Sequence, residues 1–129
     1  MNLYNIWNIK KQKINSTRGY LNPKIREIWW YNLGMNIGKE IYGNGIGFLR
    51  PVLVINTEIP NMFIGIPLTT KLYAGKHKVF IFTNDNKKHG VIFCQIRSFD
   101  RRRLVHKMYT LSKNKYKKLF KQFKILYIK

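Results

Sequence analysis

Five short apolar runs, rich in β-branched and aromatic residues, follow one another through the middle of the chain. Runs of this length and composition favour strands, because branched and aromatic side chains pack well on a pleated surface. Turn-forming residues separate the runs, which cover residues 25–33, 50–56, 62–70, 78–83 and 90–98. Several short strands of unequal length predict a small antiparallel sheet that curls into a half-open barrel.

The N-terminal end of the chain changes to helical spacing. Leu3, Tyr4, Trp7 and Ile14 recur on one helical face, and Asn2 is available as an N-cap. We expect a short amphipathic helix that docks on the domain.

In the C-terminal residues 111–129 the apolar residues also recur at helical spacing. Ser112 is a natural N-cap, and lysines lie opposite an apolar face made by Tyr116, Leu119, Phe120, Phe123 and Tyr127. The sequence therefore predicts a mainly β fold with a short N-terminal helix and a C-terminal amphipathic helix.

A chain of 129 residues has room for one domain with a packed core. The only visible boundary is the turn-rich stretch Asn15 to Lys24. We expect a helical extension and turn over residues 1–24, then the barrel domain with its C-terminal helix over residues 25–129. Because the single cysteine, Cys94, cannot form an intramolecular disulfide, the chain suits a reducing cytosol.

Charge points to the class of partner. The chain has 25 lysines and arginines against 5 acidic residues, a formal net charge of +20. Such an excess attracts polyanions, of which nucleic acid is the usual intracellular one. An acidic protein partner, or a basic surface that only confers solubility, is the alternative, since AT-rich coding sequence also enriches lysine.

The acidic residues argue against metal chemistry. They are scattered along the chain, and the three histidines lie in separate segments without ligand-like spacing. A two-metal nuclease needs clustered carboxylates, so we expect no metal and no cofactor. We expect Cys94 to be a core thiol rather than a nucleophile, and His77, His89 and His106 to be solvated loop residues.

Polar residues gather where the predicted strands begin or end. Arg50 precedes Pro51, which cannot donate to a sheet and so marks a strand start. Two other strand ends carry Thr69, Thr70 and Lys71, and Gln95, Arg97 and Ser98. If these three ends converge at one rim of a barrel, they make a place for a phosphate.

Four motifs in this order carry a resemblance to a known family. They are "NIGKE", "RPVLVI", "IPLTTK" and "QIRSFDRRRL", followed by the C-terminal helix. The chain resembles the MazF/PemK family of toxin–antitoxin endoribonucleases from about residue 25 to residue 123. The N-terminal "NIWNIKKQKIN" and the "GNGIGF" insert are similar to a bacterial subgroup of that family.

The resemblance implies a fold and an activity. Family members are small SH3-like barrels of the CcdB/MazF type, usually homodimers, and each toxin is neutralised by a cognate antitoxin. They cut single-stranded RNA without a metal, leaving a cyclic phosphate and a 5′-hydroxyl, because the ribose 2′-OH attacks the adjacent phosphate.

The resemblance also implies roles for particular residues. Arg50 would be the phosphate clamp, Thr69 the catalytic threonine, and Glu40 a base or a group that orients Arg50. The RNA-binding residues would be Lys39, Thr70, Lys71, Gln95, Arg97 and Ser98.

Two questions stay open at this level. The alternative function is a non-catalytic basic module of the same fold, either an RNA-binding protein or a CcdB-like topoisomerase poison; DNA binding together with the antitoxin also fits the charge. Trp29 and Trp30 are adjacent on a predicted strand and must point to opposite faces, so one belongs to the core and the other to an interface or RNA groove.

Overall fold

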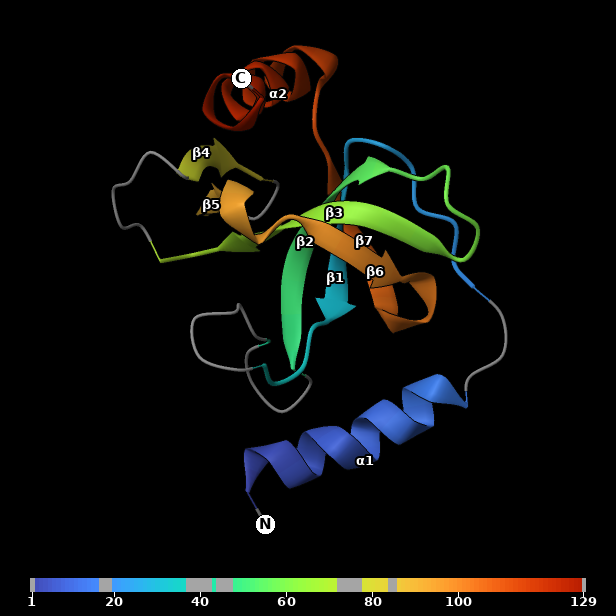
Figure 1. Cartoon of the computed structure of the whole chain (residues 1–129). Coiled ribbons are helices and arrows are strands. Elements are labelled where there is room, and N and C mark those ends of the chain that lie inside the picture. Colours follow the sequence, from blue (N-terminus) through green and yellow to red (C-terminus); the bar gives the residue numbers. More distant parts are fainter. Residues whose placement is uncertain are drawn as a thin grey trace.

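The fold is an antiparallel sheet between two helices, seen in a computed structural model (Figure 1). The structure describes residues 2–16, 20–36, 43, 48–71, 78–83 and 86–128. The helices are α1 (Leu3–Asn15) and α2 (Lys113–Tyr127), with short 3-10 helices η1 (Phe93–Gln95) and η2 (Arg101–Arg103). The strands are β1 (Glu27–Asn32), β2 (Leu49–Asn56), β3 (Met62–Thr69), β4 (Lys78–Phe82), β5 (Lys88–Ile92), β6 (Arg97–Asp100) and β7 (Leu104–Thr110).

The strands pair in the order β4-β5-β3-β2-β1-β7, and β6 also pairs with β3. Every pairing is antiparallel. The path runs from β4 to β7 and does not close within the described residues, so the sheet is a half-open barrel. Figure 1 places α1 and α2 on opposite sides of it. The predicted fold class, mainly β with a helix at each end, is confirmed.

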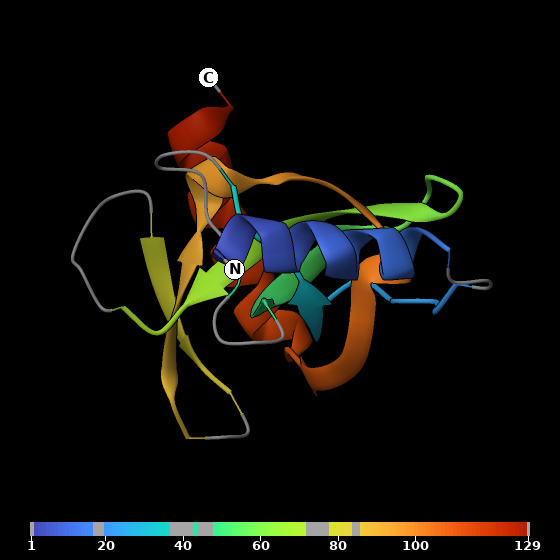
Figure 2. The ribbon, with the colours of Figure 1, turned by 90° about the horizontal axis from the view of Figure 1, so that it is seen from below.

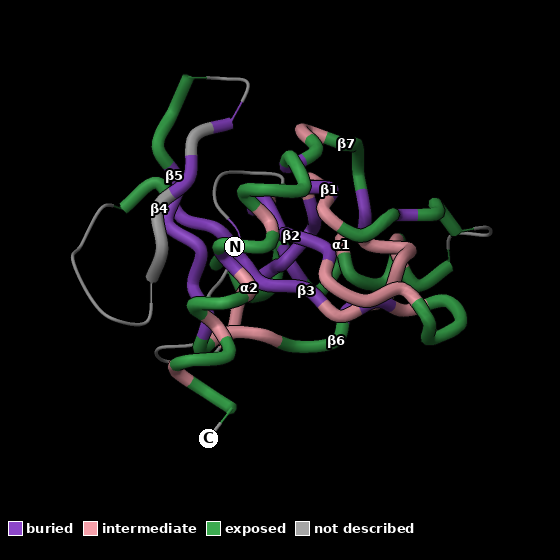
Figure 3. The backbone as a smooth tube through the Cα atoms, turned by 90° about the horizontal axis from the view of Figure 1, so that it is seen from above, coloured by how far each residue is buried: buried purple, intermediate pink, exposed green. Residues whose placement is uncertain are grey.

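The sheet has a hydrophobic core on each face. Side chains alternate between the faces along a strand, so neighbouring residues of β2 belong to different cores. One core, which α2 covers with Leu119, contains Ile28, Leu53, Ile66, Leu68, Ile81, Val91, Phe93 and Leu111. The other contains Tyr31, Leu33, Val52, Val54, Phe63, Phe99 and Leu104. Figure 3 shows that the buried residues are concentrated in the sheet, whereas the residues of the helices are largely exposed.

The two tryptophans of β1 point to opposite faces, as expected. Trp29 packs against the second core, and its indole nitrogen donates to Glu27 Oε1 at 3.1 Å. Trp30 is half-buried on the other face, with its ring 6.3 Å from that of His106. Both tryptophans are half-buried, and Trp29 is the one that packs against a core.

Both helices begin where the sequence predicts. The Asn2 side chain accepts from Asn5 N–H at 2.9 Å, and the Ser112 side chain accepts from Lys115 N–H at 3.2 Å. The buried face of α1 is narrower than expected, because Trp7 is buried while Leu3 and Tyr4 are more than half exposed. No helix in the described ranges is both long and apolar enough to cross a membrane.

Four expectations about single residues were wrong, hold only in part or concern a residue outside the described ranges. Cys94 is exposed, because the predicted strand 90–98 breaks at η1 and turns the thiol outward. His89 is buried within β5 at 2% exposure, whereas His106 is exposed but lies in β7 rather than in a loop. His77 lies outside the described residues.

The strand β7 was missed because most of its side chains are exposed and follow no apolar alternation. Its pairing with β1, in a register that shifts twice, makes it a strand. Glu27 at the start of β1 helps to hold the two together, since its Oε2 lies 3.3 Å from Lys107 Nζ on β7. The same carboxylate accepts from the backbone N–H of Lys24 at 2.7 Å.

These contacts decide how Glu27 titrates. Burial raises the pKa of the carboxyl, but the hydrogen bonds from Lys24, Trp29 and Lys107 and the charge of Lys107 outweigh it and hold the pKa below its ordinary value. A carboxylate whose folded pKa is depressed stabilises the fold above its unfolded pKa and loses that contribution as pH falls through the folded one.

We therefore expect the free energy of unfolding to fall as pH drops below about 4.3, the ordinary pKa of glutamate. Glu27→Gln should flatten that fall, because the amide cannot gain the proton. Urea unfolding between pH 7 and pH 3 measures the effect, with Glu58→Gln as the exposed control. Equal acid sensitivity of wild type and Glu27→Gln would contradict this account.

Candidate functional site

The neighbouring strands β2 and β3 place the Arg50 side chain beside the residue that precedes Thr69. β2 pairs with β3 so that Val52 lies opposite Pro67 and Leu53 opposite Ile66. The pairing ends at Val52 and Pro67, and alternation along the strands places Arg50 and Thr69 on the same face, just beyond the paired residues. The Nη1 of Arg50 donates to the carbonyl of Leu68 at 3.1 Å, which is the residue before Thr69.

Both side chains are held firmly. Arg50 and Thr69 are each 5% exposed, and the backbone of Arg50 also pairs with Tyr31 of β1. Thr69 pairs in turn with Gly90 of β5. A guanidinium stays charged and offers a planar fork of donors, so a fixed arginine at a strand start is suited to bind a phosphate.

The Thr69 hydroxyl is oriented by the turn that follows it. The backbone N–H of Lys71 donates to Thr69 Oγ1 at 3.1 Å. That bond uses the acceptor side of the hydroxyl, so its hydrogen can donate to a phosphoryl oxygen. Thr70 and Lys71 are exposed directly beyond it, which gives the edge of the pair a polar and basic border.

The third group of predicted site residues lies farther along β3. Arg97 and Ser98 of β6 are exposed and pair with Gly65 and Ile64. Gly65 is four residues from Thr69, roughly 13 Å at about 3.3 Å per residue. Gln95 is half-buried in η1. This short helix follows β5, which pairs with Thr69, and precedes β6. The strand ends that carry Arg50 and Thr69 lie next to each other. The third group, Gln95 to Ser98, lies farther along β3.

Two candidate residues, Lys39 and Glu40, lie outside the described residues. Within the described ranges no three His, Cys, Asp or Glu side chains gather in a group able to hold a metal ion. The described chemistry of the site is thus a cation, a hydroxyl and backbone groups.

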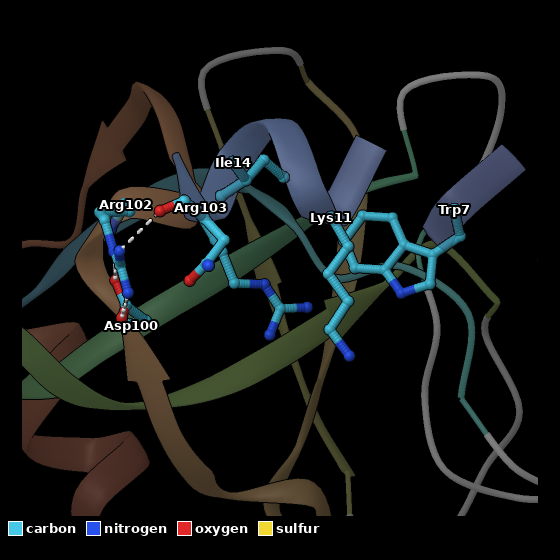
Figure 4. Close-up of a pocket in the computed structure, with 7 residues that line it drawn as sticks. Trp7, Lys11, Ile14, Asp100, Arg102 and Arg103 are labelled. Atoms are coloured by element: carbon cyan, nitrogen blue, oxygen red, sulfur yellow. Dashed lines mark hydrogen bonds and ion pairs between the residues drawn. The ribbon is translucent and has the colours of Figure 1, made fainter. Parts of the chain in front are cut away.

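A separate cavity of about 170 Å³ lies between α1 and the segment around η2 (Figure 4). Its lining comprises Trp7, Lys11, Ile14, Asn15, Asp100, Arg102 and Arg103. Arg102 forms an ion pair with Asp100 at 2.9 Å and also donates to the carbonyl of Asn15 at 3.0 Å. Hydrogen bonds from Arg102, outweighing burial, hold the pKa of Asp100 below its ordinary value.

The three consecutive arginines of η2 bind backbone carbonyls of other elements. Arg101 donates to Met62 and Thr57 carbonyls, each at 2.8 Å, and so ties the β2–β3 connection to β6. Arg103 donates to the carbonyls of Asn32 and Leu33 at 2.8 and 2.7 Å, at the end of β1. Sequence reasoning missed these structural roles, because a basic run looks the same whether it faces solvent or carbonyls.

Comparison with known proteins gives both a family and a set of similar folds. A family described as PemK-like, MazF-like toxin of type II toxin-antitoxin system matches residues 24–127. Among curated proteins, no sequence is similar enough to match.

Solved structures with this fold include three toxins. MazF from Deinococcus radiodurans has a TM-score of 0.67 at 18% identity, covering 82% of this chain and 96% of that one. A mycobacterial endoribonuclease in complex with its cognate antitoxin has a TM-score of 0.61 at 13% identity, covering 80% and 92%. Mycobacterium tuberculosis toxin MazF-mt6 has a TM-score of 0.60 at 16% identity, covering 78% and 94%.

These likenesses establish the fold, and the family match spans the sheet and α2 with the Arg50 and Thr69 positions inside it. The chain belongs to the PemK/MazF family of toxins of type II toxin–antitoxin systems.

Proposed function

We propose that this toxin is a metal-independent endoribonuclease that cuts single-stranded RNA, such as mRNA, at a site built on Arg50 and Thr69. The observation that carries the proposal is the hydrogen bond from the Arg50 guanidinium to the Leu68 carbonyl, directly beside Thr69, whose hydroxyl is oriented by the N–H of Lys71. Family membership supports the reaction class, and one solved relative is itself described as an endoribonuclease.

The reaction suits a site without a protein nucleophile. The ribose 2′-oxygen forms a bond to the adjacent phosphorus while the bond from phosphorus to the 5′-oxygen breaks, which leaves a cyclic phosphate. The 2′-OH proton passes to a base, and the leaving 5′-oxygen takes up a proton. The protein must orient the ribose, move these protons and stabilise charge on the phosphoryl oxygens.

The proposed roles divide as follows. Arg50 binds the phosphoryl oxygens through its fork of donors, and Thr69 donates its hydroxyl hydrogen to the same phosphate. Glu40 acts as the base or orients Arg50. The strand–strand register supports a shared target for Arg50 and Thr69, because only adjacent groups can bind one phosphate.

The RNA would continue from this site across exposed polar residues. Thr70 and Lys71 border the pair, and Gln95, Arg97 and Ser98 follow the edge of β3; Lys39 completes the proposed set. The guanidinium of Arg97 lies 4.9 Å from the centre of the Phe99 ring, a cation–π contact that helps to hold its position on this surface.

We also propose a cognate antitoxin and a second copy of the chain as partners. Solved relatives include complexes of MazF with MazE. With 25 basic residues against 5 acidic ones, the surface favours an antitoxin segment that is acidic, which would compete with RNA for the same groups. The proposed location is the bacterial cytoplasm, where mRNA is available.

We expect purified protein to cut a defined single-stranded RNA in the presence of EDTA. Arg50→Ala should lower the cleavage rate about 100-fold or more, because an oriented donor to developing charge is lost. Arg50→Lys keeps the charge but loses the planar fork of donors. Its cleavage rate should lie between those of wild type and Arg50→Ala. Thermal melting of each variant separates lost chemistry from lost folding.

Cleavage that needs an added divalent metal, or Arg50→Ala that cuts as fast as wild type, would contradict the proposal. If wild type leaves RNA intact but inhibits DNA supercoiling by gyrase, the non-catalytic alternative is correct.

The Thr69 hydroxyl can be removed with little change of shape. We expect Thr69→Val to lower kcat by about 100-fold, the cost of removing one oriented hydrogen-bond donor to developing charge. Thr69→Ser should retain most of the rate, because it keeps the hydroxyl. Thr70→Val is the matched control at the exposed neighbouring position and should change kcat little. Equal rates for Thr69→Val and Thr69→Ser would show that the hydroxyl takes no part.

A further inference from the structure

We propose that Trp7 of α1 is a positioning residue for Arg50, holding the start of β2 in the conformation that presents the arginine. α1 precedes the part of the chain that matches the family, residues 24–127. The catalytic consequence rests on the proposed function, whereas the structural effect can be measured without it.

Trp7 packs directly on the end of β1. It is the buried residue of α1, at 6% exposure, and its indole lies on Gly34. A Cβ at Gly34 would overlap the indole, and the φ of +79° at this residue is one that glycine adopts readily. Gly34 thus provides both the turn after β1 and the space for Trp7. Figure 2 shows α1 lying across this side of the sheet.

Trp7 also contacts the residue that leads into β2. The ring centroids of Trp7 and Phe48 are 5.3 Å apart, and Phe48 is 1% exposed. Phe48 has a φ of +53°, a left-handed conformation that a bulky residue adopts only when its surroundings hold it there. Its carbonyl accepts from Leu33 N–H at 2.9 Å and from Gly34 N–H at 3.3 Å.

Arg103 joins the same contacts from η2. Its guanidinium lies 5.4 Å from the Trp7 ring and 5.0 Å from the Tyr31 ring. Figure 4 shows Trp7 and Arg103 on the lining of the cavity beneath α1. Since Arg103 also donates to the Asn32 and Leu33 carbonyls, it fixes the end of β1 that Trp7 covers.

The residues that Trp7 contacts lie close to Arg50, both along the chain and across the sheet. Phe48 is separated from Arg50 only by Leu49, and Leu49 and Arg50 pair with Asn32 and Tyr31. If the indole is removed, Phe48 can leave its left-handed conformation and the first residues of β2 shift. A misplacement of about 1 Å can cost up to about 100-fold in rate, so a small shift is enough to impair a phosphate clamp.

The test compares Trp7→Ala, Trp7→Phe and the control Tyr4→Ala, an exposed position of the same helix at 56%. Each variant is assayed on a defined RNA well below its own melting temperature. We expect Trp7→Ala to lower kcat about tenfold or more with KM within about twofold, as for lost orientation rather than lost substrate binding. Trp7→Phe should recover most of the rate, and Tyr4→Ala should match wild type.

Hydrogen exchange gives a readout independent of activity. In Trp7→Ala the amides of Leu33 and Gly34, which donate to Phe48, should exchange faster, together with the start of β2. The amides of Phe63 to Gly65, in the part of β3 that pairs with β6, should keep their wild-type protection. A purely stabilising role for α1 would instead raise exchange across the sheet in parallel.

Trp7→Leu tests the same contact with a smaller apolar side chain, which cannot fill the place of the indole against Gly34 and Phe48. It should reproduce the kinetic and exchange effects of Trp7→Ala, and it decides the question if Trp7→Ala does not fold. If both variants keep the wild-type kcat, and the amides of Leu33, Gly34 and the start of β2 exchange as in wild type, the proposal is overturned. If wild type cuts no RNA, the proposed function fails, and the exchange pattern alone still supports or refutes the positioning role.

Discussion

The antiparallel register between β2 and β3 is the constraint on which the site depends. With Val52 opposite Pro67, alternation places Arg50 and Thr69 on the same face just beyond the paired residues, and a slip of one residue would turn one of them to the other face. The register is fixed because both faces of this sheet are buried, with Leu53 in one core and Val52 in the other. The cores therefore specify the geometry of the polar pair at their border.

Positive charge in this chain serves two separate purposes. Arg101 and Arg103 donate to backbone carbonyls and hold the β2–β3 connection and the end of β1 in place. The exposed lysines and Arg97 contribute to the field that attracts a polyanion. Arg50 combines the two, because it is buried like a structural arginine yet lies beside an oriented hydroxyl.

Local patterns predicted much of the fold. Apolar runs located β1 to β5, and the caps Asn2 and Ser112 located both helices, because these signals depend on neighbouring residues. The strand β7 was not predictable in this way, since pairing with β1 rather than its own burial makes it a strand. The exposure of Cys94 and the burial of His89 depend on the break at η1 and on the packing of β5, which no local pattern encodes. Of the candidate site, the strand-end pattern drew attention to Arg50 and Thr69, and their roles came from the family resemblance and stay predictions. The contact of Trp7 with Phe48 was not predictable from local pattern.

The central claim is that Arg50 and Thr69 act on one phosphate, and a double-mutant cycle on single-turnover RNA cleavage tests it most directly. The rates of Arg50→Ala, Thr69→Val and the double variant are compared with wild type, with all four shown to be folded. Groups that bind the same phosphate act as a unit, so the double variant should lose much less than the product of the two single losses. Losses that multiply as for independent sites would contradict the account.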